Sequence, residues 1–254
     1  MFTQNSVTII TAATGNQALP VCLQSVQAQT FPDVQHLVVI DGLERDVAVR
    51  SVLERYPPAS KQRDVVTLPA ATGKLNWNGH RIYAAMSFLV NTEFVCYLDE
   101  DNWFDPDHVE TLVAAVRSTP NGRWAFSLRK IVDADGRFIA DDKCESLGNL
   151  HHVFNNPQDV HIDANCYLLG REIAVGCSPI WYAPGYVPNV RDPDRTCCRE
   201  LLEFFQPASS NRKHTVNYRV GNQARSVQAR FFLFGNAKMK RVYPNGLPWE
   251  TPSP

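Results

Sequence analysis

The sequence predicts an α/β fold in which a mostly parallel central sheet is flanked by helices. Short β-branched or apolar runs at residues 7–11, 37–40, 65–68 and 94–98 alternate with segments of helical periodicity. Strands that alternate with helices are typical of parallel sheets, because a parallel connection must return across the whole sheet. The 254 residues are enough for one large domain with a buried core.

Four helices are predicted between and after these strands. Apolar residues spaced i, i+3, i+4 and i+7 indicate the first helix, at residues 19–26. The second covers residues 49–56, and the third runs from residue 80 to about residue 90. The fourth begins at Asp105-Pro106, since a carboxylate is a favoured N-cap and proline is favoured at the first helical position.

The second half of the chain has a weaker pattern. Trp124–Val132 alternates, Asp133–Gly136 forms a turn, and Arg137–Ile139 returns, which predicts a β-hairpin. A further helix is expected at Asp194–Phe205. We therefore expect a single domain over residues 1–254, with a regular half at 1–120 and a more irregular half at 121–254.

Composition and charge exclude several classes of protein. The chain has 25 Lys and Arg against 26 Asp and Glu, for a net charge of −1, whereas nucleic-acid binding through phosphate contacts needs a basic excess. No apolar run approaches the length of about 20 residues that spans a bilayer, and the N-terminus does not resemble a secretory signal. Seven cysteines without a C-x-x-C pair argue against a zinc finger and a disulfide framework. A reduced, cytoplasmic protein is expected.

Polar residues follow three of the predicted strands, at the sheet edge where ligands bind in α/β folds. They are the segment 11–14, Asp41, and the run Asp99-Glu100-Asp101. Because alternate residues of an extended segment point the same way, Asp99 and Asp101 can share one ligand while Glu100 turns aside. Two close carboxylates repel each other, and a divalent cation such as Mg²⁺ or Mn²⁺ relieves that repulsion. An acidic turn that caps the next helix is the alternative interpretation of the same run.

These segments resemble family 2 glycosyltransferases of the GT-A fold. The run Phe94–Asn102 resembles the family's D-x-D strand, and residues 7–12 with 23–32 resemble its first strand and its S-V-x-x-Q-T-x-P helix end. Val38–Gly42 resembles the strand that ends in V-D-D-G-S, although Ile40 and Leu43 depart from that pattern. The resemblance covers about the first 115 residues and implies a GT-A sheet whose residues 1–120 bind the nucleotide-sugar, with 121–254 on the acceptor side.

The resemblance also implies roles for residues of the nucleotide site. Thr11, Ala12 and Ala13 would form the wall against the base and ribose, and Asp41 would hydrogen-bond the base. Arg81 would help to neutralise the diphosphate. The residues alone allow strand termination for Thr11, turn chemistry for Asp41 and an ordinary surface cation for Arg81.

For the metal, the resemblance implies that Asp101 binds Mn²⁺ or Mg²⁺ directly and that Asp99 lies near the ribose and the water shell of the ion. His214 would be a third ligand, with a structural histidine as the alternative. The family's usual Glu-Asp pair before a late helix is absent, so Asp194 is chosen as the catalytic base and Asp192 is held in reserve. A helix N-cap is the alternative role for Asp194.

On the acceptor side, Asp163 would order sugar hydroxyls, and Trp181 would stack on a sugar ring or simply pack in the core. The implied enzyme is an inverting, metal-dependent hexosyltransferase that moves a sugar from a nucleotide-diphosphate donor, expected to be a UDP-sugar, to a saccharide or lipid-linked glycan. No transmembrane segment is expected, and lipid-linked acceptors would place the protein peripherally at the inner face of the membrane.

Two other functions remain as alternatives. A catalytically silent module would keep the nucleotide or sugar site without the base, as the missing Glu-Asp pair allows. A sugar-phosphate nucleotidyltransferase also pairs acids around Mg²⁺, but it needs a basic, glycine-rich loop after the first strand. Residues 11–16 contain no Lys or Arg, which disfavours that function.

Overall fold

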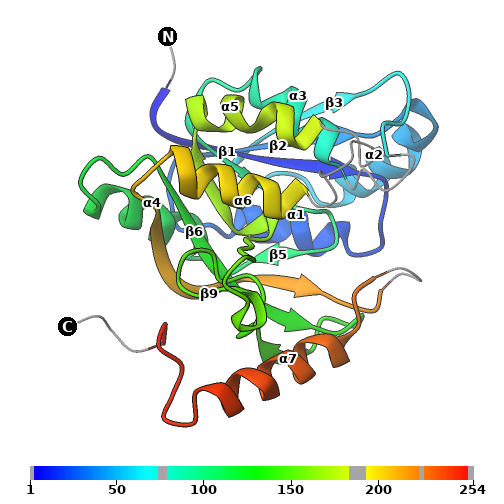
Figure 1. The fold of residues 1–254 in the computed structure, drawn as a ribbon. Helices are drawn as coiled ribbons and strands as arrows, with labels where there is room; N and C mark the ends of the chain where they lie inside the picture. The colour runs from blue at the N-terminus through cyan, green and yellow to red at the C-terminus, as the bar shows by residue number, and fades with distance from the viewer. Residues whose placement is uncertain (1–2, 74–78, 183–192, 223–225, 251–254) are drawn as a thin grey trace.

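One mixed sheet runs through the whole protein. A computed structural model describes residues 3–73, 79–182, 193–222 and 226–250. Within these residues the sheet has the order β3-β2-β1-β4-β8-β6-β9-β5, and β7 pairs with β6 alone. Figure 1 shows the sheet curling through the molecule, with helices on both of its faces.

The first four strands are parallel, as the sequence predicts. They are β1 (Thr3–Ala13), β2 (Val34–Ile40), β3 (Gln62–Thr67) and β4 (Thr92–Tyr97). β1 lies in the centre of the four and pairs with β2 and β4 in parallel. Its residues 6–11 are buried on both faces, which explains the continuous apolar run in the sequence. The carboxyl ends of β1, β2 and β4 therefore meet at one edge of the sheet.

The remaining strands extend the sheet beyond β4. They are β5 (Trp103–Phe104), β6 (Trp124–Val132), β7 (Phe138–Asp141), β8 (Tyr167–Gly170) and β9 (Ser209–Arg219). The β6–β7 hairpin is the one predicted from the sequence, although β7 begins and ends slightly later. β8 is antiparallel to β4 and β6, whereas β9 returns parallel to β6 and reaches β5.

Two layers of helices cover the sheet. α1 (Leu19–Gln27) and α2 (Asp46–Arg55) pack against β1 and β2, and α4 (His108–Ser118) packs against β6, β8 and β9. On the opposite face, α3 (His80–Ser87), α5 (Arg171–Tyr182) and α6 (Pro193–Phe204) pack against one another. α7 (Ala229–Val242) follows β9 and packs on β6 and β7.

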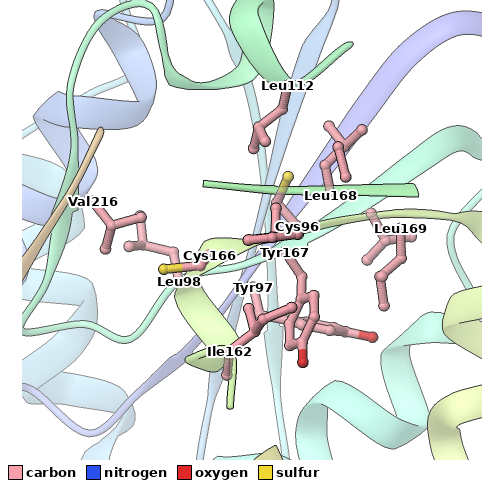
Figure 2. Close-up of a cluster of buried hydrophobic side chains, with 14 of the residues drawn as sticks. Cys96, Tyr97, Leu98, Leu112, Ile162, Cys166, Tyr167, Leu168, Leu169 and Val216 are labelled. Carbon is pink, nitrogen blue, oxygen red and sulfur yellow. The ribbon is translucent and has the colours of Figure 1, made fainter. Parts of the chain in front are cut away.

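The largest core joins the two halves of the chain. Figure 2 shows Cys96 and Tyr97 of β4 beside Tyr167 and Leu168 of β8, with Leu112 of α4 close by. All seven cysteines are buried and none forms a disulfide, as the cysteine pattern predicts.

The prediction of an irregular second half is wrong in several places. α5, α7, β8 and β9 are regular elements that the sequence pattern did not reveal. α5 contains Pro179, which weakens its helical signal, and α7 has apolar side chains on more than one side. The fourth helix begins at His108 rather than at Asp105-Pro106, because Trp103–Phe104 first pairs with β9.

Candidate active site

A polar pocket of about 500 Å³ opens at the carboxyl ends of β1, β2 and β4. Its walls come from both halves of the chain, because the segment before β8, the start of α6 and the end of β9 all reach it. Six carboxylate side chains line it, against two arginines and one histidine: Asp41, Asp99, Glu100, Asp101, Asp163, Asp194, Arg45, Arg219 and His80. A diphosphate entering this pocket therefore meets an excess of negative charge.

Two neighbours, Tyr83 and Asn165, hold Asp99 through three hydrogen bonds as it leaves β4. Tyr83 Oη donates to Asp99 Oδ1 at 2.5 Å, and Asn165 Nδ2 donates to Asp99 Oδ2 at 2.8 Å. The backbone N–H of Asp99 in turn donates to Asn165 Oδ1 at 2.7 Å. Burial, with the nearby charges of Asp101 and Asp163, raises the pKa of Asp99 to about 7. A cation beside this carboxylate would favour its ionised form.

Asp101 lies at the same edge and is fixed by the end of β9 and the segment after it. Asn222 Nδ2 donates to Asp101 Oδ2 at 2.6 Å, and Arg219 Nε donates to the carbonyl oxygen of Asp101 at 2.9 Å. Burial raises the pKa of Asp101 more than these contacts lower it. Asp99 and Asp101 thus form a pair of half-buried carboxylates in one pocket, as the D-x-D spacing predicts.

Glu100 serves a different purpose from the acids beside it. Its carboxylate accepts hydrogen bonds from the backbone N–H groups of Thr14, Gly15 and Asn16 at 2.9–3.0 Å, and from the Thr14 hydroxyl. It therefore fixes the loop that follows β1, and it turns away from the Asp99–Asp101 pair as the alternation predicts.

Asp41 ends β2 at the far side of the pocket. Its carboxylate accepts from the backbone N–H groups of Thr72 at 2.6 Å and Gly73 at 3.1 Å, and Arg45 Nη1 lies 3.2 Å from Oδ2. Asp41 lines the pocket and is largely buried. In this conformation the Asp41 carboxylate links the end of β2 to the segment that follows β3.

The side chains of Thr11, Ala12 and Ala13, which were predicted to form a wall against the base and ribose, do not all face the pocket. Ala12 lines the pocket. Thr11 points to the opposite face, where its hydroxyl lies 3.0 Å from His36 Nε2, and Ala13 packs in the core under α1 and α2. Because side chains alternate across a strand, only the middle residue of the three offers its side chain to a ligand.

Asp194 lies at the start of α6 and faces the pocket between two histidines. His80 Nε2 is 3.8 Å from Asp194 Oδ1, and His161 Nε2 is 4.0 Å from Oδ2. Burial lowers the pKa of His161, but the interaction with Asp194 and the charge of Glu145 outweigh it, and the net shift is upward.

Asp163 lines the pocket and also belongs to a buried cluster of charged side chains. Arg129, which is 2% exposed, contacts the carboxylates of Asp142, Glu145 and Asp163 at 2.5–2.8 Å. Asp163 Oδ1 accepts from Asn165 Nδ2 at 2.7 Å, so the cluster is connected through one amide to Asp99. Burial lowers the pKa of Arg129, but the three carboxylates more than compensate and raise it.

Trp181 and Arg81 are also absent from the pocket lining. Trp181 is fully buried and packs on His80 and Tyr97, so its ring offers no surface to a sugar. Arg81 lies over the ring of Tyr182, with its guanidinium carbon 5.4 Å from the ring centroid. Asp192, the reserve base, is outside the described residues.

His214 also lies away from the carboxylate pair. It is opposite Leu128 on β9, four or five residues from Tyr218 and Arg219, which do line the pocket. At about 3.3 Å per residue, that is roughly 13–17 Å along the strand. The geometry therefore gives no support to His214 as a metal ligand.

The described residues contain no group of three His, Cys, Asp or Glu side chains placed to hold a metal ion without other ligands. A Mg²⁺ or Mn²⁺ ion in this pocket would need the two carboxylates together with water and substrate phosphates, which is the usual coordination of Mg²⁺ at phosphate sites. The residues present fit a substrate-assisted metal site of this kind.

Sequence reasoning missed most of the residues that fix the acids. The residues come from three separate segments, and none lies in a motif: Tyr83 and His80, Asn165 and His161, and Arg219 and Asn222. Their only sequence signal is their place next to a predicted element, such as His80 at the start of the third helix.

Among helices in the part of the chain that the structure describes, none is both long enough and apolar enough to span a bilayer. No curated protein sequence matches the chain.

Comparison with solved structures places the fold among GT-A glycosyltransferases. S. aureus TarS matches with a TM-score of 0.61 and 13% identity, over 85% of this chain and 37% of that one. S. aureus TarS 1-349 in complex with UDP-GlcNAc matches with a TM-score of 0.60 and 13% identity, over 93% and 65% of the two chains. The mannosyltransferase PcManGT from Pyrobaculum calidifontis, in complex with GDP-Man and Mn²⁺, matches with a TM-score of 0.57 and 14% identity, over 94% and 64%.

The chain spans less than two thirds of the length of each of these structures, and at such identities the likeness concerns the fold alone. The family is shown by the sequence itself, because the model of glycosyl transferase family 2 matches residues 6–172. That span contains β1, the Asp99–Asp101 pair and Asp163, and it exceeds half of the chain, so this protein belongs to glycosyl transferase family 2.

Proposed function

We propose that this protein transfers a sugar from a nucleotide-diphosphate donor to a saccharide or lipid-linked glycan, with inversion and with a divalent cation. The observation that carries the proposal is the pocket, in which Asp99 and Asp101 lie together and Asp194 faces them from α6. A UDP-sugar is the donor we expect. A TarS structure contains UDP-GlcNAc and a PcManGT structure contains GDP-Man, so both nucleotide classes belong in the test.

The donor would lie along the carboxyl ends of β1 and β2, with its diphosphate towards Asp101. Asp99 and Asp101 would hold Mn²⁺ or Mg²⁺, which when bound neutralises charge on the leaving diphosphate. Arg219 is the arginine of the pocket nearest to Asp101, and its guanidinium is held by the Asp101 and Ala134 carbonyl oxygens. Asn165 and Tyr83 keep the Asp99 carboxylate in place throughout.

Asp194 would act as the base that removes the proton from the acceptor hydroxyl. The hydroxyl oxygen then attacks the anomeric carbon on the face opposite the departing diphosphate, which inverts that centre. His80 and His161 face the two carboxylate oxygens and would position the Asp194 side chain. Asp163, held by Arg129, would contact sugar hydroxyls beside it.

The metal assignment is tested by replacing Asp101 with alanine. Mn²⁺-dependent UDP affinity should then fall to the level measured in EDTA, because one of the two carboxylate ligands is missing. Isothermal titration of UDP with and without Mn²⁺ gives the result, and Asp33→Asn, which removes an exposed carboxylate just before β2 at the opposite edge of the sheet, is the matched control. Equal UDP affinity in Asp101→Ala and the parent protein would remove Asp101 from the metal site.

The base assignment is tested by Asp194→Asn, which keeps the shape of the side chain and removes its basicity. Donor affinity should stay unchanged while transfer slows by about 10²–10⁴-fold, the usual contribution of a general base. Asp192→Asn is the matched variant two residues away, and we expect it to keep full activity. The opposite pattern would assign the base to Asp192 instead.

A thermal-shift screen of UDP- and GDP-sugars with Mn²⁺ would identify the donor, because a ligand that binds the folded state raises Tm. A silent binding module would also show this shift. It would release no UDP or GDP from any donor, with or without saccharide acceptors, and that result would overturn the enzymatic proposal.

A further inference from the structure

The outer face of α7 combines exposed apolar and cationic side chains. The segment from Ser226 to Tyr243, which comprises α7 and the residues that flank it, contains no Asp or Glu. Four exposed cations belong to this segment: Arg230, Lys238, Lys240 and Arg241. The consecutive residues Leu233 and Phe234 are 50% and 72% exposed, so they form an apolar pair at the surface.

The inner face of α7 is firmly attached to the protein. Phe232, Gly235 and Met239, spaced i, i+3 and i+7, are its buried residues. A Cβ atom at Gly235 would overlap the Cys144 side chain, so glycine permits the close approach of the helix at this point. Asn236 adds two hydrogen bonds, donating to the Asp141 carbonyl oxygen at 2.7 Å and accepting from the Lys143 N–H at 2.9 Å.

This attachment fixes which side chains face outwards. At 100° per residue, Arg230, Leu233, Phe234 and Arg241 lie within about 50° of the direction opposite the buried stripe. Figure 1 shows α7 along one edge of the molecule, with none of the described helices or strands on its outer side. The helix thus presents an apolar pair surrounded by positive charge, in a fixed orientation.

We propose that the outer face of α7 docks on an anionic lipid surface. A helix that lies in a membrane interface inserts large apolar side chains among the acyl chains and places Lys and Arg beside anionic headgroups. The whole chain has a net charge of −1 and is not attracted to such a surface in general. The attraction comes from the local concentration of four cations on one helix with no acid.

The position of α7 also relates the docking face to the active-site pocket. Ser226 and Val227, immediately before the helix, line that pocket. A docked α7 would therefore hold the pocket mouth near the headgroups, where an acceptor attached to a lipid is presented. This consequence rests on the proposed function, whereas the docking itself does not.

Sedimentation with sucrose-loaded vesicles tests the docking without any measurement of activity. The 254-residue chain should bind vesicles of phosphatidylcholine with 30% phosphatidylserine and should bind pure phosphatidylcholine far more weakly. Each cation near an anionic surface contributes about fivefold to the partition coefficient, so Arg230→Gln/Arg241→Gln should bind about 25-fold more weakly. Phe234→Ser should bind about tenfold more weakly, because its side chain no longer enters the acyl region.

Matched controls separate this face from general surface properties. Arg55→Gln/Arg137→Gln removes two exposed cations elsewhere, and Phe204→Ser removes a phenylalanine that is 62% exposed at the end of α6. Both should bind like the parent chain. Absence of binding to the anionic vesicles, or equal losses in the controls and the α7 variants, would overturn the proposal.

A second copy of the chain is the alternative partner for the outer face of α7, and the experiment must be able to detect it. Analytical ultracentrifugation of the parent chain without lipid should show a monomer. A concentration-dependent dimer that Phe234→Ser abolishes would instead assign this face to self-association and would refute lipid docking.

Discussion

Two buried histidines should each lower the stability of this protein in mild acid. His36 and His108 are fully buried, and burial lowers the pKa of each to about 3. His36 lies against Thr11, and His108 stacks on Phe104 while its Nδ1 lies 2.7 Å from the Thr215 hydroxyl. Both imidazoles are therefore neutral in the folded protein over the whole range in which an unfolded histidine, with a pKa of about 6.5, takes up a proton.

The magnitude follows from these values. At pH 5 an unfolded histidine is almost fully protonated, whereas the folded protein binds no proton at either site. The contribution of each histidine to the free energy of unfolding thus falls by about 2 kcal/mol between pH 7 and pH 5, or about 4 kcal/mol for the pair, while protonation of Asp99 acts in the opposite direction. The stability is present above pH 6.5 and is lost as the pH falls towards 3.

Urea unfolding at pH 7 and pH 5 measures this loss. His108→Asn, which keeps a polar partner for Thr215, and His36→Val, which suits a buried strand, should each reduce the difference between the two pH values by about 2 kcal/mol. Imidazole proton shifts of the folded parent protein provide a check that needs no variant, since neither ring should titrate above pH 4. Titration of either ring near pH 6.5, or an unchanged pH difference in both variants, would refute the reasoning.

Two further predictions concern contacts away from the reacting groups. Asn165→Ala should weaken Mn²⁺ binding in the presence of UDP by about 10–100-fold, as removal of an outer-shell partner usually does, and an unaltered Mn²⁺ titration would contradict it. Gly235→Ala should lower the free energy of unfolding by about 1–3 kcal/mol through overlap with Cys144, whereas Ala237→Ser on the exposed side of α7 should have little effect. Equal stability of the two variants in urea would show that the helix can move away.

The first half of the fold was predictable because its sequence signals are local. β1, β2 and β4 are buried on both faces and therefore read as continuous apolar runs, and the helices between them carry a regular apolar stripe. β9 gave no such signal, because apart from Ser209 only Thr215–Asn217 are buried. α7 was obscured by the apolar residues of its outer face, which break the expected stripe.

The sequence by itself determined which chemistry is available: a D-x-D spacing at the end of a buried strand, Asp41 two strands away in the sheet order, and an acid before a late helix. Strand alternation and strand order are local rules, so these features could be inferred without coordinates. The resemblance to family 2 glycosyltransferases follows from the same short segments.

Only the tertiary structure decided which side chains reach the pocket and what holds them there. Asn165 bridges Asp99 and Asp163, His161 faces Asp194, and Asn222 holds Asp101 across more than a hundred residues of chain. His214 was excluded from the pocket by its register on β9, and Trp181 by burial behind His80. The physical reason is that hydrogen bonds and burial between distant segments depend on how the strands and helices pack, and a residue's own neighbours in the sequence carry no record of that packing.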